Sequence, residues 1–164
     1  INLRLSNIVG AFEHGVLGEY VTQLPKNIVP LALQVVAMQR DCIELQNQAQ
    51  TEDGTVERSF LHVLDACDAV LIALNWLKTQ TSCLEAFNIA HHQLTSIQNL
   101  IDEVARVTQT EIQVQPAVYQ NQELAQLGAN IDKAKKILNW VPKRSLSQMI
   151  EDEWRFYLNT LKGN

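Results

Sequence analysis

One short segment gathers side chains that could bind a metal ion or act as a general base. His62 is followed closely by Asp65 and Asp68. Both carboxylates fall where the first turn of a helix is expected, and there they can cap backbone N–H groups and favour the helix dipole. Because no third ligand is spaced nearby, we interpret the three residues as structural.

Histidines and cysteines elsewhere offer weaker candidates. His91 and His92 follow an expected strand, but adjacent side chains on an extended backbone point to opposite sides, which favours a solvated loop. Cys67 lies in an apolar stretch and is expected to be a small core residue. With Cys42 and Cys83 it forms no C-x-x-C pair, which favours a reduced, cytoplasmic protein.

Arg58 is the strongest candidate for ligand binding. It lies in the run Val-Glu-Arg-Ser-Phe on an expected strand, beside positions that should be buried. A guanidinium in that environment needs a carboxylate or an anionic ligand. From these residues alone, an internal salt bridge and a bound anion are equally good interpretations.

The elements that must position these groups alternate between strands and helices, which predicts an α/β fold. A loop rich in glycine should follow Asn7, and the helix at 65–78, with almost no polar face, should be sandwiched between layers. Trp140, Trp154 and Tyr157 should pack in the core. Strands are expected at 1–5, 43–45, 56–63, 85–90 and 112–115, and the polar turn 47–55 should join two of them in a hairpin. Helices are expected at 30–40, 65–78 and 131–138. Two more helices should follow the capping boxes Thr95-x-x-Gln98 and Ser145-x-x-Gln148.

Composition excludes several classes of protein. The 164 residues are 46% hydrophobic and 19% charged, which suits one globular domain with a substantial core. A net charge of −5 without blocks of like charge argues against nucleic-acid or anionic-membrane partners. The longest apolar run, 69–74, is far shorter than the ~20 residues of a membrane span. Since the chain starts at Ile1 without Met or a secretion signal, we expect a piece of a longer protein.

A long run at 51–65, T-E-D-G-T-V-E-R-S-F-L-H-V-L-D, resembles the T-x-D-G-T-x-x-R-D-Y-I-H-V-x-D segment of UDP-glucose 4-epimerases. Upstream, L-R-L-S-N-I-V-G-A at 3–11 and L-P-K-N-I-V-P at 24–30 resemble the family's L-R-Y-F-N-x-x-G-A and I-P-N-N-L-M-P. Downstream, F-N-I at 87–89 and D-K-A-K-K-I-L-N-W at 132–140 resemble Y-N-L and S-K-A-x-x-E-L-x-W. The resemblance covers nearly the whole chain in order.

This resemblance implies that residues 1–164 are the C-terminal, substrate-binding region of an extended Rossmann-type epimerase, including the last strands of its parallel sheet. In that family an N-terminal Rossmann domain holds NAD and a Tyr-x-x-x-Lys pair, and full-length proteins commonly form homodimers. This sequence has neither that pair nor a glycine-rich dinucleotide fingerprint. Hydride transfer and proton transfer would therefore require the missing domain.

The resemblance also implies roles for individual positions. Asn7 and Asn27 match asparagines that touch the UDP-sugar, and Ile28 replaces the leucine beside the second. Arg58 matches the arginine that grips the diphosphate, and Ser6 falls at a cofactor-binding position. We expect Arg58 to share one anion-binding cleft with the two asparagines.

Several matched positions depart from the family pattern. Gln46 stands where an aromatic side chain packs on uracil, and Leu127 stands where a tyrosine contacts the ligand. Gln120 and Glu123 belong to a run that replaces R-R-E-G-D, which removes a phosphate-binding arginine. We therefore expect weaker UDP-sugar binding than in typical relatives. Two alternatives to the epimerase stay open: a non-catalytic binding or assembly module, and an enzyme for another sugar substrate.

Overall fold

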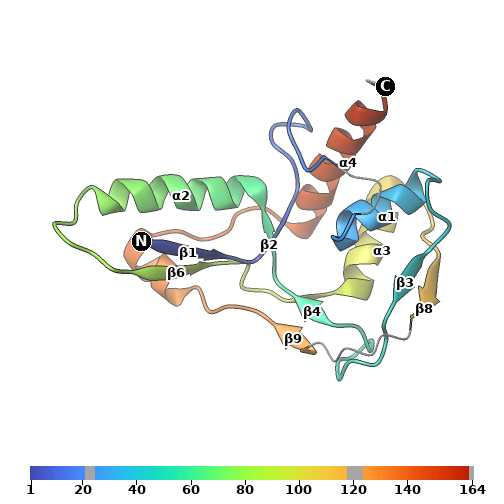
Figure 1. The fold of residues 1–164 in the computed structure, drawn as a ribbon, viewed down its shortest axis with the longest axis horizontal. Helices are drawn as coiled ribbons and strands as arrows, with labels where there is room; N and C mark the ends of the chain where they lie inside the picture. Colours follow the sequence, from blue (N-terminus) through green and yellow to red (C-terminus); the bar gives the residue numbers. More distant parts are fainter. Residues whose placement is uncertain (21–24, 118–123, 163–164) are drawn as a thin grey trace.

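The computed structural model of the chain describes residues 1–20, 25–117 and 124–162. It confirms the α/β class, but the strands form short separate groups instead of one wide sheet (Figure 1). Parallel pairs are β1 (Asn2–Leu5) with β6 (Ala86–Ile89), β2 (Asn7–Val9) with β5 (Phe60–His62), and β3 (Ile43–Leu45) with β8 (Val114–Pro116). A fourth group holds β4 (Glu57–Arg58) between antiparallel β7 (Thr95–Ser96) and parallel β9 (Gln126–Leu127).

The helices divide between two buried clusters of side chains. One cluster joins α2 (Val63–Leu77), β6 and the π-helical turn η1 (Ala134–Leu138), and includes Phe87 and Trp140. The other joins α1 (Ile28–Val36), α3 (Ile97–Thr108) and α4 (Leu146–Lys162). Figure 1 shows α2 lying along the β1–β6 pair, with α1, α3 and α4 gathered on the opposite side of β2. The strand pair β2–β5 therefore stands between the two clusters.

The expected aromatic core is confirmed. Trp140 and Tyr157 are almost fully buried, and the indole of Trp140 donates a hydrogen bond to the Asp65 carbonyl at 3.1 Å. Trp154 is partly buried and stacks on Tyr157 with ring centroids 5.9 Å apart. These rings hold the C-terminal segment against both clusters.

Strand pairing differs from the expectation in two places. The expected strand 56–63 is broken at Ser59, so that β4 and β5 join different groups of strands. The expected hairpin is wrong, because β3 pairs with β8. The turn at 47–55 is held by a local hydrogen bond, in which the Thr55 amide donates to the Asp53 carboxylate at 2.8 Å. The segment after Ser6, expected to be loop, forms β2. The strand expected at 112–115 lies at Val114–Pro116.

Helix boundaries also move, for identifiable reasons. The helix expected at 30–40 begins at Ile28 and ends at Val36, and Met38 then has φ +57° and is 93% exposed. Pro30 is the third residue of α1, and the N–H groups of the first turn have no acceptor within the helix, so the missing N–H of proline costs nothing there. A proline therefore locates the start of a helix only to within one turn. Ser96, not Thr95, caps α3 by accepting the Asn99 amide.

The capping box before α4 is confirmed. The Ser145 amide donates to Gln148 Oε1 at 2.9 Å, and the Gln148 amide donates to Ser145 Oγ at 3.3 Å. Over the described ranges of the chain, no helix combines the length and the apolar character that a membrane crossing requires.

Candidate functional site

A pocket of about 710 Å³ opens beside β2 and the starts of α1 and α2, with α4 behind it. Ser6, Asn7, Asn27 and Ile28 all line it, although about twenty positions separate the two pairs. Its volume lies within the range of small-molecule sites, and its walls combine apolar side chains with a few polar groups, as such sites usually do. The polar or charged lining residues are Ser6, Asn7, Glu19, Lys26, Asn27 and Glu153.

Ser6 marks the point where the chain leaves one strand pair and enters the next. Its amide donates to the Ile89 carbonyl at 3.1 Å, and the Asn7 amide donates to the Ser59 carbonyl at 3.3 Å. The Ser6 hydroxyl oxygen is buried and has no hydrogen-bond partner in the described part of the chain. Because buried polar groups are normally paired, this hydroxyl suits a polar group of a ligand.

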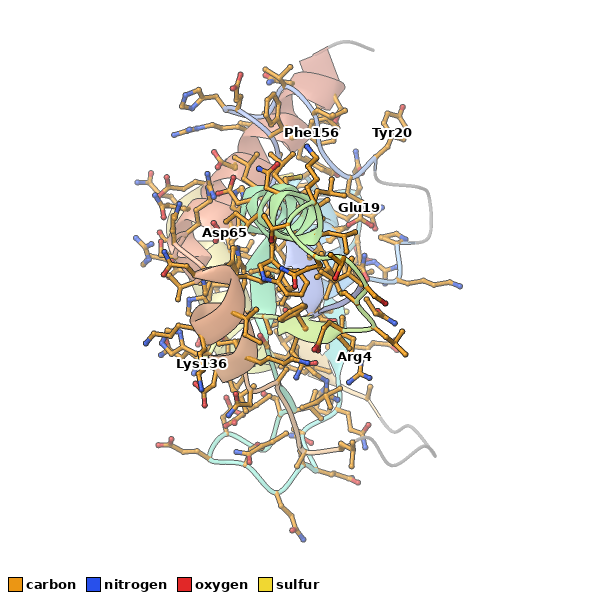
Figure 2. The ribbon with its side chains drawn as sticks, turned by 90° about the vertical axis from the view of Figure 1, so that its left-hand side faces the viewer. Arg4, Glu19, Tyr20, Asp65, Lys136 and Phe156 are labelled. Atoms are coloured by element: carbon orange, nitrogen blue, oxygen red, sulfur yellow. The ribbon has the colours of Figure 1, made fainter. Side chains whose placement is uncertain are left out.

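Asn27 is held at the pocket rim by the loop that precedes α1. Its side-chain amide donates to both carboxylate oxygens of Glu19, at 3.0 and 3.2 Å. Figure 2 labels Glu19 to one side of α2, with Asp65 on the opposite side. Lys26 is adjacent in sequence and, among the described residues lining the pocket, is the one cation. This end of the pocket therefore carries both signs of charge.

Glu153 was not predicted as a site residue. It reaches the pocket from α4, is 3% exposed, and accepts the Gly10 amide at Oε2 with a distance of 2.8 Å. Burial raises the pKa of this carboxyl to about 7, the Gly10 hydrogen bond opposes the rise, and the charge of Glu19 adds to it. The sequence did hold a signal, because residue 153 follows Met149 and Ile150 at helical spacing on the apolar side of α4.

His62 stands directly behind Gly10 and has the structural role expected of it. Its Nδ1 accepts the Leu64 amide at 3.0 Å, which caps α2, so Nε2 carries the proton and donates to Asp152 Oδ2 at 3.2 Å. Burial lowers the pKa of this imidazole, more than the Asp152 hydrogen bond raises it. The ring is thus a neutral link between β5 and α4.

The structural role expected of Asp65 is confirmed and it lies in the first turn of α2, but the predicted capping by Asp65 and Asp68 is wrong, because His62 caps this helix. Asp65 is buried and accepts the Lys143 and Arg144 amides at 3.0 Å each, together with the Arg144 guanidinium. Asp68 is more exposed and lies 3.8 Å from the Arg144 guanidinium. Asp65 therefore anchors the segment before α4, and Asp68 adds only a longer, more exposed contact with the same guanidinium. Across residues 1–20, 25–117 and 124–162, no cluster of three or more metal-ligating side chains occurs.

Arg58 does not line the pocket that holds the two asparagines. Its Nη1 donates to the Glu57 carbonyl at 2.9 Å and to the Leu124 carbonyl at 2.8 Å. Arg58 pairs with Leu127 of β9. Two residues after Arg58 comes Phe60, which pairs with Asn7 and lines the pocket. Arg58 is thus next to the pocket along the chain, on a different group of strands.

Of the remaining candidates, Cys67 lines this pocket, and the others lie away from it or outside the described residues. Gln46 follows β3 and is half-buried, and Gln120 and Glu123 fall in 118–123, outside the described residues. The His91 and His92 rings stack with centroids 4.6 Å apart, so the expectation that they point to opposite sides is wrong. Cys67 is exposed and lines the pocket, which overturns its expected place in the core.

Comparisons with known proteins show which sequences and structures the chain resembles. The UDP-glucose 4-epimerase of Bos taurus is 30% identical over 98% of this chain and 46% of its own length, and that of Halalkalibacterium halodurans is 31% identical over 94% and 46%. The crystal structure of UDP-glucose-4-epimerase from Stenotrophomonas maltophila with bound NAD and formylated UDP-arabinopyranose matches with a TM-score of 0.93 at 26% identity, over 99% of this chain and 48% of that one.

The chain thus spans about half the length of the relatives that it matches. A family model described as GDP-mannose 4,6 dehydratase matches residues 2–153, nearly all of the sequence. The chain belongs to the NAD-dependent epimerase/dehydratase family.

Proposed function

We propose that residues 1–164 form the UDP-sugar-binding part of an NAD-dependent sugar 4-epimerase. In that role the pocket would hold the sugar nucleotide, and NAD, bound mainly by another part of the protein, would supply the hydride chemistry needed at the sugar C4. One observation carries the proposal: Ser6, Asn7, Asn27 and Ile28, predicted from two distant motifs, line the same pocket.

Polar groups in the pocket, and Arg58 next to it along the chain, suit different parts of such a ligand. The side-chain amides of Asn7 and Asn27 can both donate to and accept from sugar hydroxyls. Lys26 offers a cation for a phosphate oxygen, and Arg58 offers the fork geometry that phosphate groups prefer. Since Arg58 precedes the pocket-lining Phe60 by two residues, a diphosphate extending from the pocket could reach it.

The fit to NAD rests on Ser6 in this part of the protein. Ser6 lines the pocket, and its buried hydroxyl has no hydrogen-bond partner among the described residues, which leaves this hydroxyl available to a polar group of the cofactor. Because the sequence lacks a glycine fingerprint, the pyrophosphate of NAD would bind elsewhere.

The test is calorimetric titration of the complete natural polypeptide that carries residues 1–164 with UDP and UDP-glucose, together with an epimerase assay. Micromolar UDP-glucose binding and turnover are expected. Asn7→Ala should weaken binding about tenfold through loss of a hydrogen bond, whereas Gln48→Ala, at an exposed position outside the pocket, should not.

Other outcomes would contradict the proposal in different ways. Binding of UDP-glucose without turnover, even with NAD added, would favour a non-catalytic binding module. Turnover of a different nucleotide sugar would favour another substrate. Failure to bind any UDP ligand would refute the proposal.

A further inference from the structure

We infer that Glu153 determines the ligand specificity of this pocket, by accepting a hydroxyl of a neutral sugar and rejecting a sugar that carries a carboxylate. The inference rests on the proposed function, because it assumes that a nucleotide sugar enters the pocket. Its basis is the position of one buried carboxyl among the residues that line the pocket.

The carboxyl has one oxygen committed and one available. Oε2 accepts the Gly10 amide at 2.8 Å, and within the described part of the chain no other donor contacts this side chain. A buried carboxyl loses its hydration, so a second donor inside the pocket would be favourable. A ligand hydroxyl is such a donor, whereas a ligand carboxylate is not.

Among the described residues, no cation contacts the Glu153 carboxyl. Glu19 also lines the pocket, and its negative charge repels the Glu153 carboxylate. Behind Gly10, His62 is neutral because its Nδ1 accepts an amide hydrogen, and the charge of its partner Asp152 is offset by the Arg155 guanidinium at 3.6 Å. Among the described residues that line the pocket, the cation is Lys26. It is adjacent in sequence to Asn27, whose side-chain amide donates a hydrogen bond to Glu19. The diphosphate is therefore expected on the Lys26 side and the neutral sugar at Glu153.

Specificity of this origin depends on pH. Because the pKa of Glu153 is raised to about 7, the side chain is an anion at pH 8 and mostly neutral at pH 6. Rejection of an anionic sugar should be strong at the higher pH and weaker at the lower one. A side chain that only held Gly10 in place would not produce this difference between two sugars.

The test compares UDP-glucose with UDP-glucuronic acid, two ligands that differ by a carboxylate in the sugar, in titrations of the complete NAD-loaded protein. The wild type should prefer UDP-glucose by about tenfold or more at pH 8 and by less at pH 6. Glu153→Gln keeps an oxygen for the Gly10 amide but removes the charge. It should reduce the preference at pH 8 and abolish its pH dependence.

Glu151→Gln is the matched control. It removes a carboxylate from the same helix, where Glu151 faces Arg155 at 4.0 Å and does not line the pocket, and it should behave as the wild type. A preference that Glu153→Gln leaves unchanged, or a Glu153→Gln protein that folds but no longer binds UDP, would overturn the inference while the wild type still binds UDP. If the wild type binds no UDP ligand, the proposed function itself fails.

Discussion

At the scale of single residues, Glu153 links ligand binding to stability. In the unfolded chain a glutamate titrates near pH 4.5, whereas here its pKa is about 7, so the folded state binds more protons between these values. Stability is therefore greatest below pH 4.5 for this group and falls as pH rises toward 7. Glu153→Gln should raise the free energy of unfolding above pH 7 by about 3 kcal/mol, and the gain should vanish near pH 4.5.

Denaturant unfolding across this pH range would check the prediction. His62 has the opposite trend, because its lowered pKa gives stability that is complete above pH 6.5 and is lost as pH falls. The free energy of unfolding of the variant must therefore be compared with that of the wild type at each pH, because the contribution of His62 is then the same in both proteins. A constant difference at all pH values would contradict the assignment to Glu153.

Asn27 allows ligand binding to be separated from the stability of α1. Its side chain makes no capping hydrogen bond, and Asn27→Asp keeps a residue type that is favoured at an N-cap, so the stability of α1 should change little. The new carboxylate would, however, face Glu19 where the amide now donates to it at 3.0 Å. We expect UDP-sugar affinity to fall about tenfold or more, because like charges repel across the rim of the pocket.

Titration and unfolding of the same Asn27→Asp protein would test both halves of that expectation. Unchanged affinity would show that Asn27 does not contact the ligand. A large loss of stability would show instead that its bond to Glu19 holds the fold.

The residues of the pocket show what a sequence can and cannot indicate. Asn7 and Asn27 were predicted because each lies in a recognisable motif, and motifs preserve the spacing of contacting side chains. Glu153 lies in no such motif, and only its place on an apolar helix face distinguished it. Asp65 was placed at a helix start, yet its partners are 78 and 79 residues away, a separation on which local propensity has no bearing.

At the scale of elements, Gly10 controls how β2, β5 and α4 meet. It has φ +91°, and a Cβ there would lie 2.7 Å from Nε2 of the buried His62 ring. Gly10→Ala should therefore destabilise the protein by about 3 kcal/mol or more and weaken UDP-sugar binding, since β2 carries Asn7.

Gly128→Ala is the matched control for this substitution. A Cβ at Gly128 would also meet an atom at 2.7 Å, but that atom is the end of the Leu94 side chain, which can rotate, and φ lies outside the left-handed region. Thermal unfolding of both variants should show a large loss for Gly10→Ala and a small one for Gly128→Ala. Equal losses of thermal stability in the two variants would mean that β2 can move at Gly10 without a large cost in stability.

The start of α4 was predictable because its signal is local. The box at Ser145 and Gln148 was found because both hydrogen bonds join residues three apart. The partner of β3 could not be predicted, because Ile43 pairs with Val114, 71 positions away, and the alternation of side chains along a strand does not reveal the neighbouring strand. The break at Ser59 was missed for the same reason, since its hydroxyl donates to the distant His91 carbonyl.

At the scale of the whole molecule, the chain exposes more surface than a compact protein of its mass. Its accessible area is 10329 Å², whereas about 8200 Å² is typical for 18.5 kDa. Part of the excess is a stripe on α2, where Cys67, Val70, Leu71 and Leu74 are exposed at helical spacing. The opposite side of α2 packs on β6, so the predicted sandwich has one layer within the described residues.

Residues 1–164 by themselves should not bind NAD with micromolar affinity. The sequence has no glycine-rich loop for the pyrophosphate, and Ser6 offers a single contact. Titration with NAD, after circular dichroism has verified that the isolated chain is folded, measures this directly. Micromolar binding would contradict the division of roles proposed above.

The stripe on α2 predicts where another part of the protein should lie. A helix that is apolar on both faces is stable when both are covered, and the relatives are about twice as long as this chain. Cys67, in the stripe, should therefore react with a maleimide much more slowly in the complete polypeptide than in residues 1–164 alone. Cys42 and Cys83, both half-buried and outside the stripe, are internal controls whose rates should change less. Equal Cys67 rates in the two proteins would mean that this face of α2 stays open to solvent, and its apolar character would then require a different partner.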